Sequence, residues 1–226
     1  MRENENIVIW GDSIAKGVIF DSNRGRYAIS KEPAFRTVSN ALGADIVNRA
    51  KMGMTITDGF KTMKQDLEKG IKCDIGVIEF GGNDSDFNWE QISENPDKRY
   101  DSKTPVAVFE DKLKSMILLL KEKCIRPVLV TLPPVNASKY FDFITKNLNP
   151  ANVLKWLGER ETIYRFHEQY SVIIAKVAKE CGCMLIDLRR AFAGVGDDPD
   201  LLCADGVHPN DKGQRLIGKT ILENMV

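Results

Sequence analysis

Two segments at opposite ends of the chain carry side chains that could act together on an acyl group. Ser13 stands shortly after the apolar run Ile7–Trp10, and His208 lies three residues after Asp205 in a loop flanked by glycine and proline. A serine hydroxyl is a poor nucleophile until a base takes its proton. The spacing of three lets the Asp205 carboxylate reach one imidazole nitrogen while the other points outward. The pattern therefore indicates a nucleophile, a general base and a residue that orients the base.

Acyl chemistry also needs hydrogen-bond donors directed at the negative charge that develops on the carbonyl oxygen. The backbone N–H groups of Ser13 and Gly53 and the side-chain amide of Asn83 are suitable donors for such an oxyanion hole. A glycine allows close approach of the backbone, and a carboxamide donates without titrating. Gly43 and Gly59 are the neighbouring alternatives to Gly53.

The other polar residues near these positions have more ordinary interpretations. We expect Asp12 and Asp84, which flank Ser13 and Asn83, to support the site by accepting backbone N–H bonds that fix their loops. The second histidine, His167, lies in an amphipathic stretch beside Phe166 and is interpreted as a packing or surface residue.

Short apolar runs alternate with longer amphipathic stretches, which is typical of a parallel sheet whose strands are joined by helices. The carboxyl ends of parallel strands lie at one edge of a sheet, where ligands bind. Ser13, Gly53, Asn83 and His208 follow the first, second, third and fifth runs, so they are expected to converge. The expected strands are Ile7–Trp10, Ala44–Val47, Ile75–Phe80, Pro127–Leu132 and Met184–Leu188.

Three stretches have apolar residues at three- and four-residue spacing and are predicted to be helices. The first spans 106–120, with Thr104-Pro105 expected to supply an N-cap and a first-turn proline. The second spans 163–177, and the third includes Leu216, Ile217 and Ile221 near the end of the chain.

Segments 85–103 and 136–160 fit neither a strand nor a core helix and are expected to be long loops. Their aromatic side chains either line a substrate cleft or close small satellite cores. No internal repeat, low-complexity tract or linker is present, so residues 1–226 are expected to form a single domain.

In their order along the chain, four sequence blocks resemble those of the SGNH (GDSL-type) hydrolases. The resemblance implies a flavodoxin-like three-layer α/β/α sandwich with a five-stranded parallel sheet, and serine hydrolysis of esters or thioesters without a metal or cofactor. By this resemblance Ser13, Asp205 and His208 form the catalytic triad. The blocks are Gly11-Asp-Ser-Ile14, Asn48-Arg-Ala-Lys-Met-Gly53, Gly81-Gly-Asn-Asp84 and Asp205-Gly-Val-His-Pro209.

Composition excludes several other classes of protein. The 32 basic and 32 acidic residues balance, so no overall field favours nucleic acid or an anionic membrane. No run approaches the ~20 apolar residues of a membrane span, and the polar segment 1–6 lacks the apolar region of a signal peptide. The five cysteines are odd in number and are expected to be reduced, which favours a cytoplasmic location. Oligomeric state is left open.

The sequence thus predicts a serine esterase that forms an acyl-enzyme on small or short-acyl esters, such as O-acetylated carbohydrate. An acyltransferase, a lysophospholipase or a thioesterase using the same residues are the alternatives. The chemically competent Ser13, Asn83 and His208 argue against a non-catalytic ligand-binding module. Segment 11–17 lacks the order of a phosphate loop, and segment 84–95 lacks the glycine and glutamate of a calcium loop.

Overall fold

A five-stranded parallel sheet forms the centre of the molecule. The computed structural model describes residues 5–195 and 200–225, so part of the polar amino-terminal segment lies outside the described residues. The strands pair in the order β4-β1-β5-β6-β7, which is 2-1-3-4-5 when they are counted along the chain. This is the order of flavodoxin-like folds, in which the connections reverse direction between the first and third strands. The strands are β1 (Ile7–Gly11), β4 (Ile46–Asn48), β5 (Ile75–Glu79), β6 (Arg126–Val130) and β7 (Met184–Ile186).

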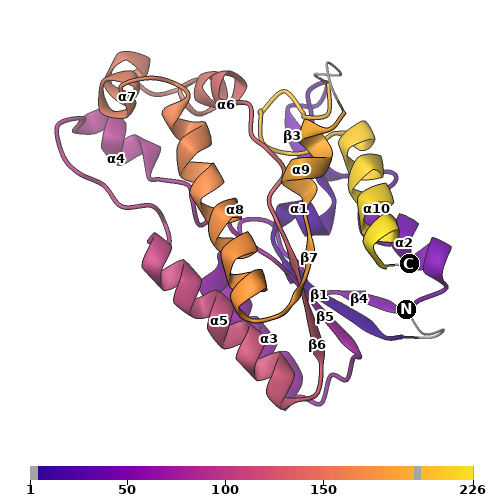
Figure 1. The fold of residues 1–226 in the computed structure, drawn as a ribbon. Helices are drawn as coiled ribbons and strands as arrows, with labels where there is room; N and C mark the ends of the chain where they lie inside the picture. The colour runs from indigo at the N-terminus through magenta and orange to yellow at the C-terminus, as the bar shows by residue number, and fades with distance from the viewer. Residues whose placement is uncertain (1–4, 196–199, 226) are drawn as a thin grey trace.

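Helices cover both faces of the sheet, which confirms the predicted three-layer α/β/α architecture (Figure 1). One face is covered by α3 (Ile56–Glu68), α5 (Val106–Glu122) and α8 (Thr162–Glu180). On the opposite face lie α2 (Ala34–Leu42), α9 (Leu188–Ala193) and α10 (Asp211–Met225). The short helix α1 (Ser13–Lys16) follows β1, and an antiparallel hairpin follows α1, formed by β2 (Val18–Asp21) and β3 (Arg26–Ile29).

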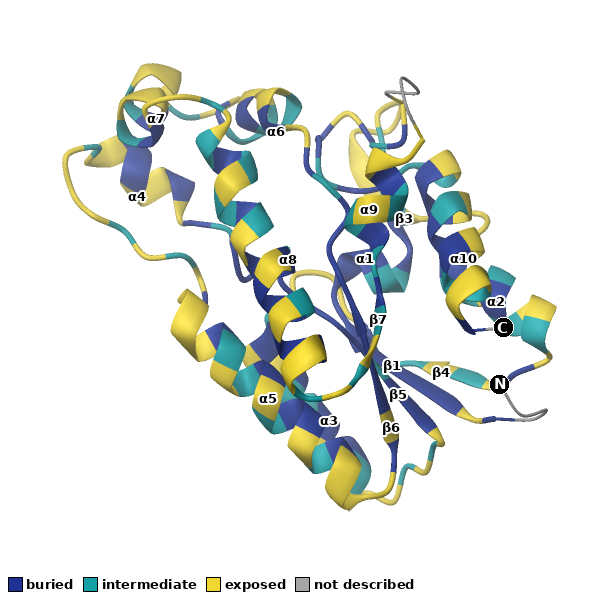
Figure 2. Cartoon of the chain, viewed as in Figure 1, coloured by how far each residue is buried: buried dark blue, intermediate teal, exposed yellow. Residues whose placement is uncertain are grey.

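The sheet lies between two apolar cores, and Figure 2 shows its central strands β1, β5 and β6 as mostly buried. The larger core packs Trp10, Ile78 and Leu129 of the strands against apolar side chains of α3, α5 and α8. The second packs Ile9, Val128 and Ile186 against helices on the other face. Strand residues therefore alternate between two buried faces, which explains why the strands appear in the sequence as continuous apolar runs.

Several of the predicted element boundaries are wrong for local reasons. Leu188 belongs to a helix and not to the last strand, because the Asp187 side chain accepts a hydrogen bond from Arg190 N and begins α9. Thr104 does not cap α5, and Pro105 occupies the N-cap position itself with no side-chain capping bond. The predicted strand 44–47 begins two residues later, at Ile46, where pairing with Ile7 starts.

The two segments expected to be long loops contain short helices. Segment 85–103 contains α4 (Trp89–Glu94), and segment 136–160 contains α6 (Ala137–Ile144) and α7 (Pro150–Leu157). Each begins at an asparagine whose side chain accepts a backbone N–H bond, namely Asn88, Asn136 and Asn149. These caps are visible in the sequence, but the helices are too short to show a clear apolar period.

The three short helices gather beside the amino-terminal half of α8 (Figure 1). Their aromatic and aliphatic side chains form a third apolar cluster that includes Phe87, Trp89, Phe141 and Ile163. We call this group of helices and its cluster the satellite subdomain. Within the described residues, no helix combines the length and apolar character that crossing a membrane requires.

A buried polar contact joins β1 to α3 through the larger core. Trp10 Nε1 donates to Asp66 Oδ2 at 2.9 Å, and the Arg49 guanidinium donates to both Asp66 oxygens at 2.8 and 2.6 Å. Burial raises the pKa of Asp66, but the hydrogen bonds from Arg49 and Trp10 outweigh it and leave the pKa below the ordinary value of 3.8.

Replacing Asp66 with alanine is expected to lower the free energy of unfolding by about 2 kcal/mol, because the buried Trp10 N–H loses its acceptor. The exposed Glu68 on the same helix provides the control, and Glu68→Ala should change stability by less than about 0.5 kcal/mol. Urea denaturation measures both values. Because the folded-state pKa is depressed, the charge-dependent part of the difference is complete above pH 3.8 and declines as the pH falls further. Equal stability of the two variants at pH 7 would contradict this role.

Candidate active site

Ser13 is held at the carboxyl edge of the sheet by a sharp transition from strand to helix. β1 ends at Gly11, and the Asp12 side chain caps α1 by accepting from Ile14 N at 2.9 Å. Ser13 is therefore the first residue of the helix, so its N–H group has no partner within the helix. The side chain is largely buried, with 6% of the residue exposed.

The loop before α10 brings Asp205 and His208 to the same place. The loop is closed at its base by a hydrogen bond of 2.7 Å from Cys203 N to His208 O. Gly206 within it has φ +75°, and a Cβ at this position would lie 2.6 Å from Tyr140 N. Only glycine fits this position, because the loop packs directly against the start of α6 and adopts a left-handed conformation.

A chain of two hydrogen bonds connects the three side chains. Ser13 Oγ lies 2.8 Å from His208 Nε2, and His208 Nδ1 lies 2.6 Å from Asp205 Oδ2. The other Asp205 oxygen accepts the N–H groups of Val207 and His208, both at 3.1 Å. Burial raises the pKa of Asp205, but the hydrogen bond and charge of His208 and the two backbone N–H bonds leave it below its ordinary value.

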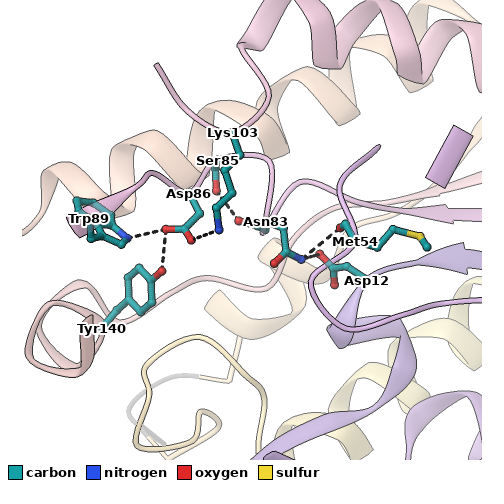
Figure 3. A network of polar contacts seen from close by, with 9 residues as sticks. Asp12, Met54, Asn83, Ser85, Asp86, Trp89, Lys103 and Tyr140 are labelled. Carbon is teal, nitrogen blue, oxygen red and sulfur yellow. Dashed lines mark hydrogen bonds and ion pairs between the residues drawn. The ribbon is translucent and has the colours of Figure 1, made fainter. Parts of the chain in front are cut away.

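The candidate oxyanion donors lie in the same cleft. Asn83 follows β5 and Gly53 follows β4, and both line the cleft with Ser13. Within the described residues, no hydrogen bond uses the N–H group of Ser13 or Gly53. The Asn83 amide is already engaged, since Nδ2 donates to Asp12 Oδ2 at 3.2 Å and to Met54 O at 3.3 Å. Figure 3 shows this amide between its two acceptors.

The alternatives to Gly53 have structural positions away from the cleft. Gly59 lies on α3 against Phe80, and a Cβ there would be 2.2 Å from the Phe80 ring. Gly43 is the C-cap of α2. By contrast, Gly53 has φ +77° and open space where a Cβ would point.

Asp84 connects, through hydrogen bonds, the loops that carry Asn83 and Gly53. Its carboxylate accepts from Ile56 N, the first residue of α3, at 3.0 and 3.2 Å, and it is completely buried. Burial raises the pKa of Asp84 to about 6, although bonds from Thr104 and Ile56 oppose the shift. Asp12 has a corresponding position under Ser13, where it contacts both Ile14 N and the Asn83 amide.

The cleft around Ser13 has a volume of about 870 Å³. On the His208 side, the Tyr27 ring lies 5.0 Å from the imidazole and contacts Phe20 of the hairpin. Burial and nearby carboxylates, Asp205 among them, raise the pKa of Tyr27 to about 12. The opposite wall comes from the satellite subdomain, so its aromatic residues both form a small core and line the cleft.

Asp86 connects the satellite subdomain to the sheet edge, as Figure 3 shows. Its carboxylate accepts from Trp89 Nε1 at 2.7 Å, Tyr140 OH at 2.8 Å and Lys103 Nζ at 2.8 Å. Burial and the Asp86 charge raise the pKa of Tyr140 well above its ordinary value, so its hydroxyl remains a donor. One carboxylate thus fixes the loop after Asn83 against α4 and α6.

His167 lines the cleft but is not part of the hydrogen-bonded chain. It is buried, and its Nδ1 lies 2.8 Å from Arg189 Nη2. Burial and the Arg189 charge lower the pKa of His167 to about 3, so the ring is neutral at physiological pH. The position agrees with a packing histidine that also contacts the cleft.

Sequence reasoning missed Asp86 and the buried Glu79, whose partners come from distant segments. Glu79 carried a signal, because it is a lone charged residue at the end of an apolar strand. Asp86 carried none, since an aspartate in a polar segment is ordinary. Among the described residues, no group of three or more His, Cys, Asp and Glu side chains is placed to hold a metal ion.

Comparison with known proteins identifies the family to which the chain belongs. The model of the GDSL-like lipase/acylhydrolase family matches residues 9–216. An isoamyl acetate-hydrolyzing esterase from Saccharomyces cerevisiae is 24% identical over 97% of this chain and 85% of its own.

Solved structures share the fold. A lipase/acylhydrolase from Enterococcus faecalis superimposes with a TM-score of 0.67 at 21% identity, covering 98% of this chain and 95% of that one. An acetylxylan esterase from Geobacillus stearothermophilus gives a TM-score of 0.67 at 20% identity, covering 100% of this chain and 95% of its own. The extent of the family match, which includes both the Ser13 and the His208 segments, shows that the chain belongs to the GDSL-like lipase/acylhydrolase family of ester-hydrolysing enzymes.

Proposed function

We propose that the protein is a serine esterase that works through an acyl-enzyme, with Ser13 as nucleophile, His208 as general base and Asp205 as the residue that orients the imidazole. The observation that carries the proposal is the pair of hydrogen bonds, 2.8 and 2.6 Å long, that links the three side chains. The ionised Asp205 accepts a hydrogen bond from His208 Nδ1–H, which leaves the Nε2 lone pair directed at the hydroxyl.

In this mechanism, Ser13 Oγ attacks the ester carbonyl carbon while its proton passes to His208 Nε2. The tetrahedral intermediate collapses when Nε2–H donates its proton to the leaving alcohol oxygen, and the acyl group remains on Ser13. Water then enters, gives a proton to Nε2 and attacks the acyl carbon. Return of that proton to Ser13 Oγ releases the acid and restores the enzyme.

The proposed oxyanion hole consists of the Ser13 and Gly53 N–H groups and the Asn83 amide. The first two have no partner among the described residues. The Asn83 amide proton that points at Met54 O has the longer of its two bonds, 3.3 Å, and is the one we propose to turn to the oxyanion. The second N–H of the Asn83 amide continues to donate to Asp12 Oδ2, which keeps Nδ2 facing the site.

We propose short-acyl esters, acetyl esters in particular, as the substrates. Asp86, Glu90, Lys103 and Lys146 lie among the mostly aromatic and aliphatic residues that line the cleft, and a long acyl chain lying across them would displace water from charged groups at a cost. The names of two relatives, an isoamyl acetate-hydrolyzing esterase and an acetylxylan esterase, support the same acyl group. The aromatic wall offers flat surfaces to an alcohol part such as a sugar.

The five cysteines, none in a disulfide, support a cytoplasmic location.

Ser13→Ala is expected to abolish hydrolysis of p-nitrophenyl acetate while the melting temperature changes little, because only one oxygen atom is removed. Ser115→Ala, at a partly exposed serine on α5 away from the cleft, is the matched control and should retain full activity. A fluorophosphonate should label the wild-type protein once and the Ser13→Ala variant not at all. Turnover by Ser13→Ala at the wild-type rate would defeat the assignment of the nucleophile.

Asn83→Ala is expected to lower kcat by about 10²–10³ with a small change in KM, because an oxyanion donor acts mainly in the transition state. Asn40→Ala, at an exposed position on α2 away from the cleft, should leave kcat close to the wild-type value. Steady-state kinetics on p-nitrophenyl acetate separates the two effects. A change in KM alone would mean that Asn83 binds substrate without stabilising the oxyanion.

A panel of p-nitrophenyl esters of increasing acyl length tests the substrate class. We expect kcat/KM for the acetate to exceed that for the decanoate by about tenfold or more, equivalent to about 1.4 kcal/mol of transition-state binding. Rates are corrected for the spontaneous hydrolysis of each ester. A preference for the decanoate would show that the charged lining does not exclude long chains.

A further inference from the structure

Glu79 lies directly behind the nucleophile in surroundings that do not suit a charge. It ends β5, pairs in register with Gly11 of β1 and has only 3% of its surface exposed. One side of it borders a small apolar cavity of about 50 Å³, lined mainly by aliphatic side chains of the second core. Its Oε2 accepts from Ala15 N at 3.2 Å and, at the longer distance of 3.5 Å, from Asp12 N, whereas no N–H or O–H group of the described residues donates to Oε1.

A second buried carboxyl group, that of Asp12, lies beside Glu79: Asp12 N donates to Glu79 Oε2 at 3.5 Å, and the two side chains form a hydrogen bond with each other. A hydrogen bond between two carboxyl groups requires that one of them is protonated. Asp12 has the better donors, namely Ile14 N at 2.9 Å and Asn83 Nδ2 at 3.2 Å, and it lies in the field of His208. The proton therefore belongs on Glu79.

The pKa directions agree with this distribution. Burial and the negative charge of Asp12 raise the pKa of Glu79 well above its ordinary value. Burial also raises the pKa of Asp12, but its backbone, Asn83 and Glu79 hydrogen bonds and the charge of His208 oppose the shift. The pair thus carries one negative charge, as expected for two carboxyl groups that share a site.

Asp12, together with Met54 O, determines which way the Asn83 amide faces. A carboxylate can only accept, so it selects the amide orientation in which Nδ2, rather than Oδ1, faces Asp12 and the cleft. A second buried charge at Glu79 would repel Asp12, and an unshielded Asp12 would oppose an oxyanion on the substrate. A hydrogen bond donated by a neutral Glu79 to the Asp12 carboxylate reduces the negative charge that Asp12 presents to the cleft.

We propose that Glu79 is a positioning residue: as a neutral acid it donates a hydrogen bond to Asp12, and through Asp12 it holds the Asn83 amide as an oxyanion donor. This inference rests on the oxyanion role proposed for Asn83 and extends that role to a buried residue that does not touch the substrate.

Kinetics of paired substitutions at Glu79 test the proposal. Glu79→Gln keeps a neutral donor of the same shape and should retain kcat within a few-fold. Glu79→Leu removes the donor and should lower kcat at least about tenfold with little change in KM, a part of the loss caused by removing an oxyanion donor outright. In an Asn83→Ala background, Glu79→Leu should have no further effect on kcat, because the residue through which it acts is absent.

Infrared spectroscopy of the wild-type protein gives a readout that does not depend on activity. At pH 7 the spectrum should contain the C=O stretch of a buried protonated carboxylic acid, and that band should be missing from Glu79→Gln. This measurement remains decisive if Glu79→Leu fails to fold, because Glu79→Gln is nearly isosteric.

Three results would overturn the proposal: an ionised Glu79 at pH 7, wild-type kcat in a folded Glu79→Leu variant, or an undiminished effect of Glu79→Leu in the Asn83→Ala background. Ser13→Ala is measured in parallel. Activity in Ser13→Ala would contradict the esterase mechanism itself, whereas an inactive Ser13→Ala beside a fully active Glu79→Leu would contradict only the role of Glu79.

Discussion

The hydrogen bond between Ser13 Oγ and His208 Nε2 is the interaction on which the rest of the structure depends. It joins two residues that are 195 positions apart in the chain, so neither local segment can form it alone. The parallel strand order brings these segments together. The adjacent strands β1 and β5 place Ser13 and Asn83 at the carboxyl edge of the sheet, where the connections reverse direction. The loop before α10 then needs only to close its short turn against α6 to bring the imidazole to the hydroxyl.

A high density of buried carboxyl groups surrounds the hydroxyl. Asp12, Glu79, Asp84 and Asp205 are all nearly inaccessible to solvent, and together they would be very unfavourable if all four were ionised without partners. The unfavourable burial of each carboxyl group is offset in a different way. Asp205 is stabilised by the imidazole and two N–H groups, Asp84 by the start of α3, and Asp12 by α1 and the Asn83 amide. For Glu79, protonation is the solution that we infer.

The satellite subdomain forms one wall of the cleft. Three short helices would not be stable in isolation, but their aromatic side chains share one cluster with the start of α8, and Asp86 anchors them to the sheet edge. Because this anchor comes three residues after Asn83, the wall of the cleft and the proposed oxyanion donor are connected through one short loop.

The sequence by itself determined the parallel α/β layout and the positions of Ser13, Gly53 and Asn83 just past strand ends, because buried strands appear as uninterrupted apolar runs. It also contained the Asp205–His208 spacing, which is a local turn. The helices in segments 85–103 and 136–160 were not predicted, because helices this short do not show a clear periodic pattern of apolar residues. Only the tertiary structure decided that Glu79 lies against Asp12, 67 positions away, and that Asp86 meets Tyr140, 54 positions away. A sequence displays the type of a side chain, whereas its protonation and role depend on which donors and charges folding brings within a few ångströms.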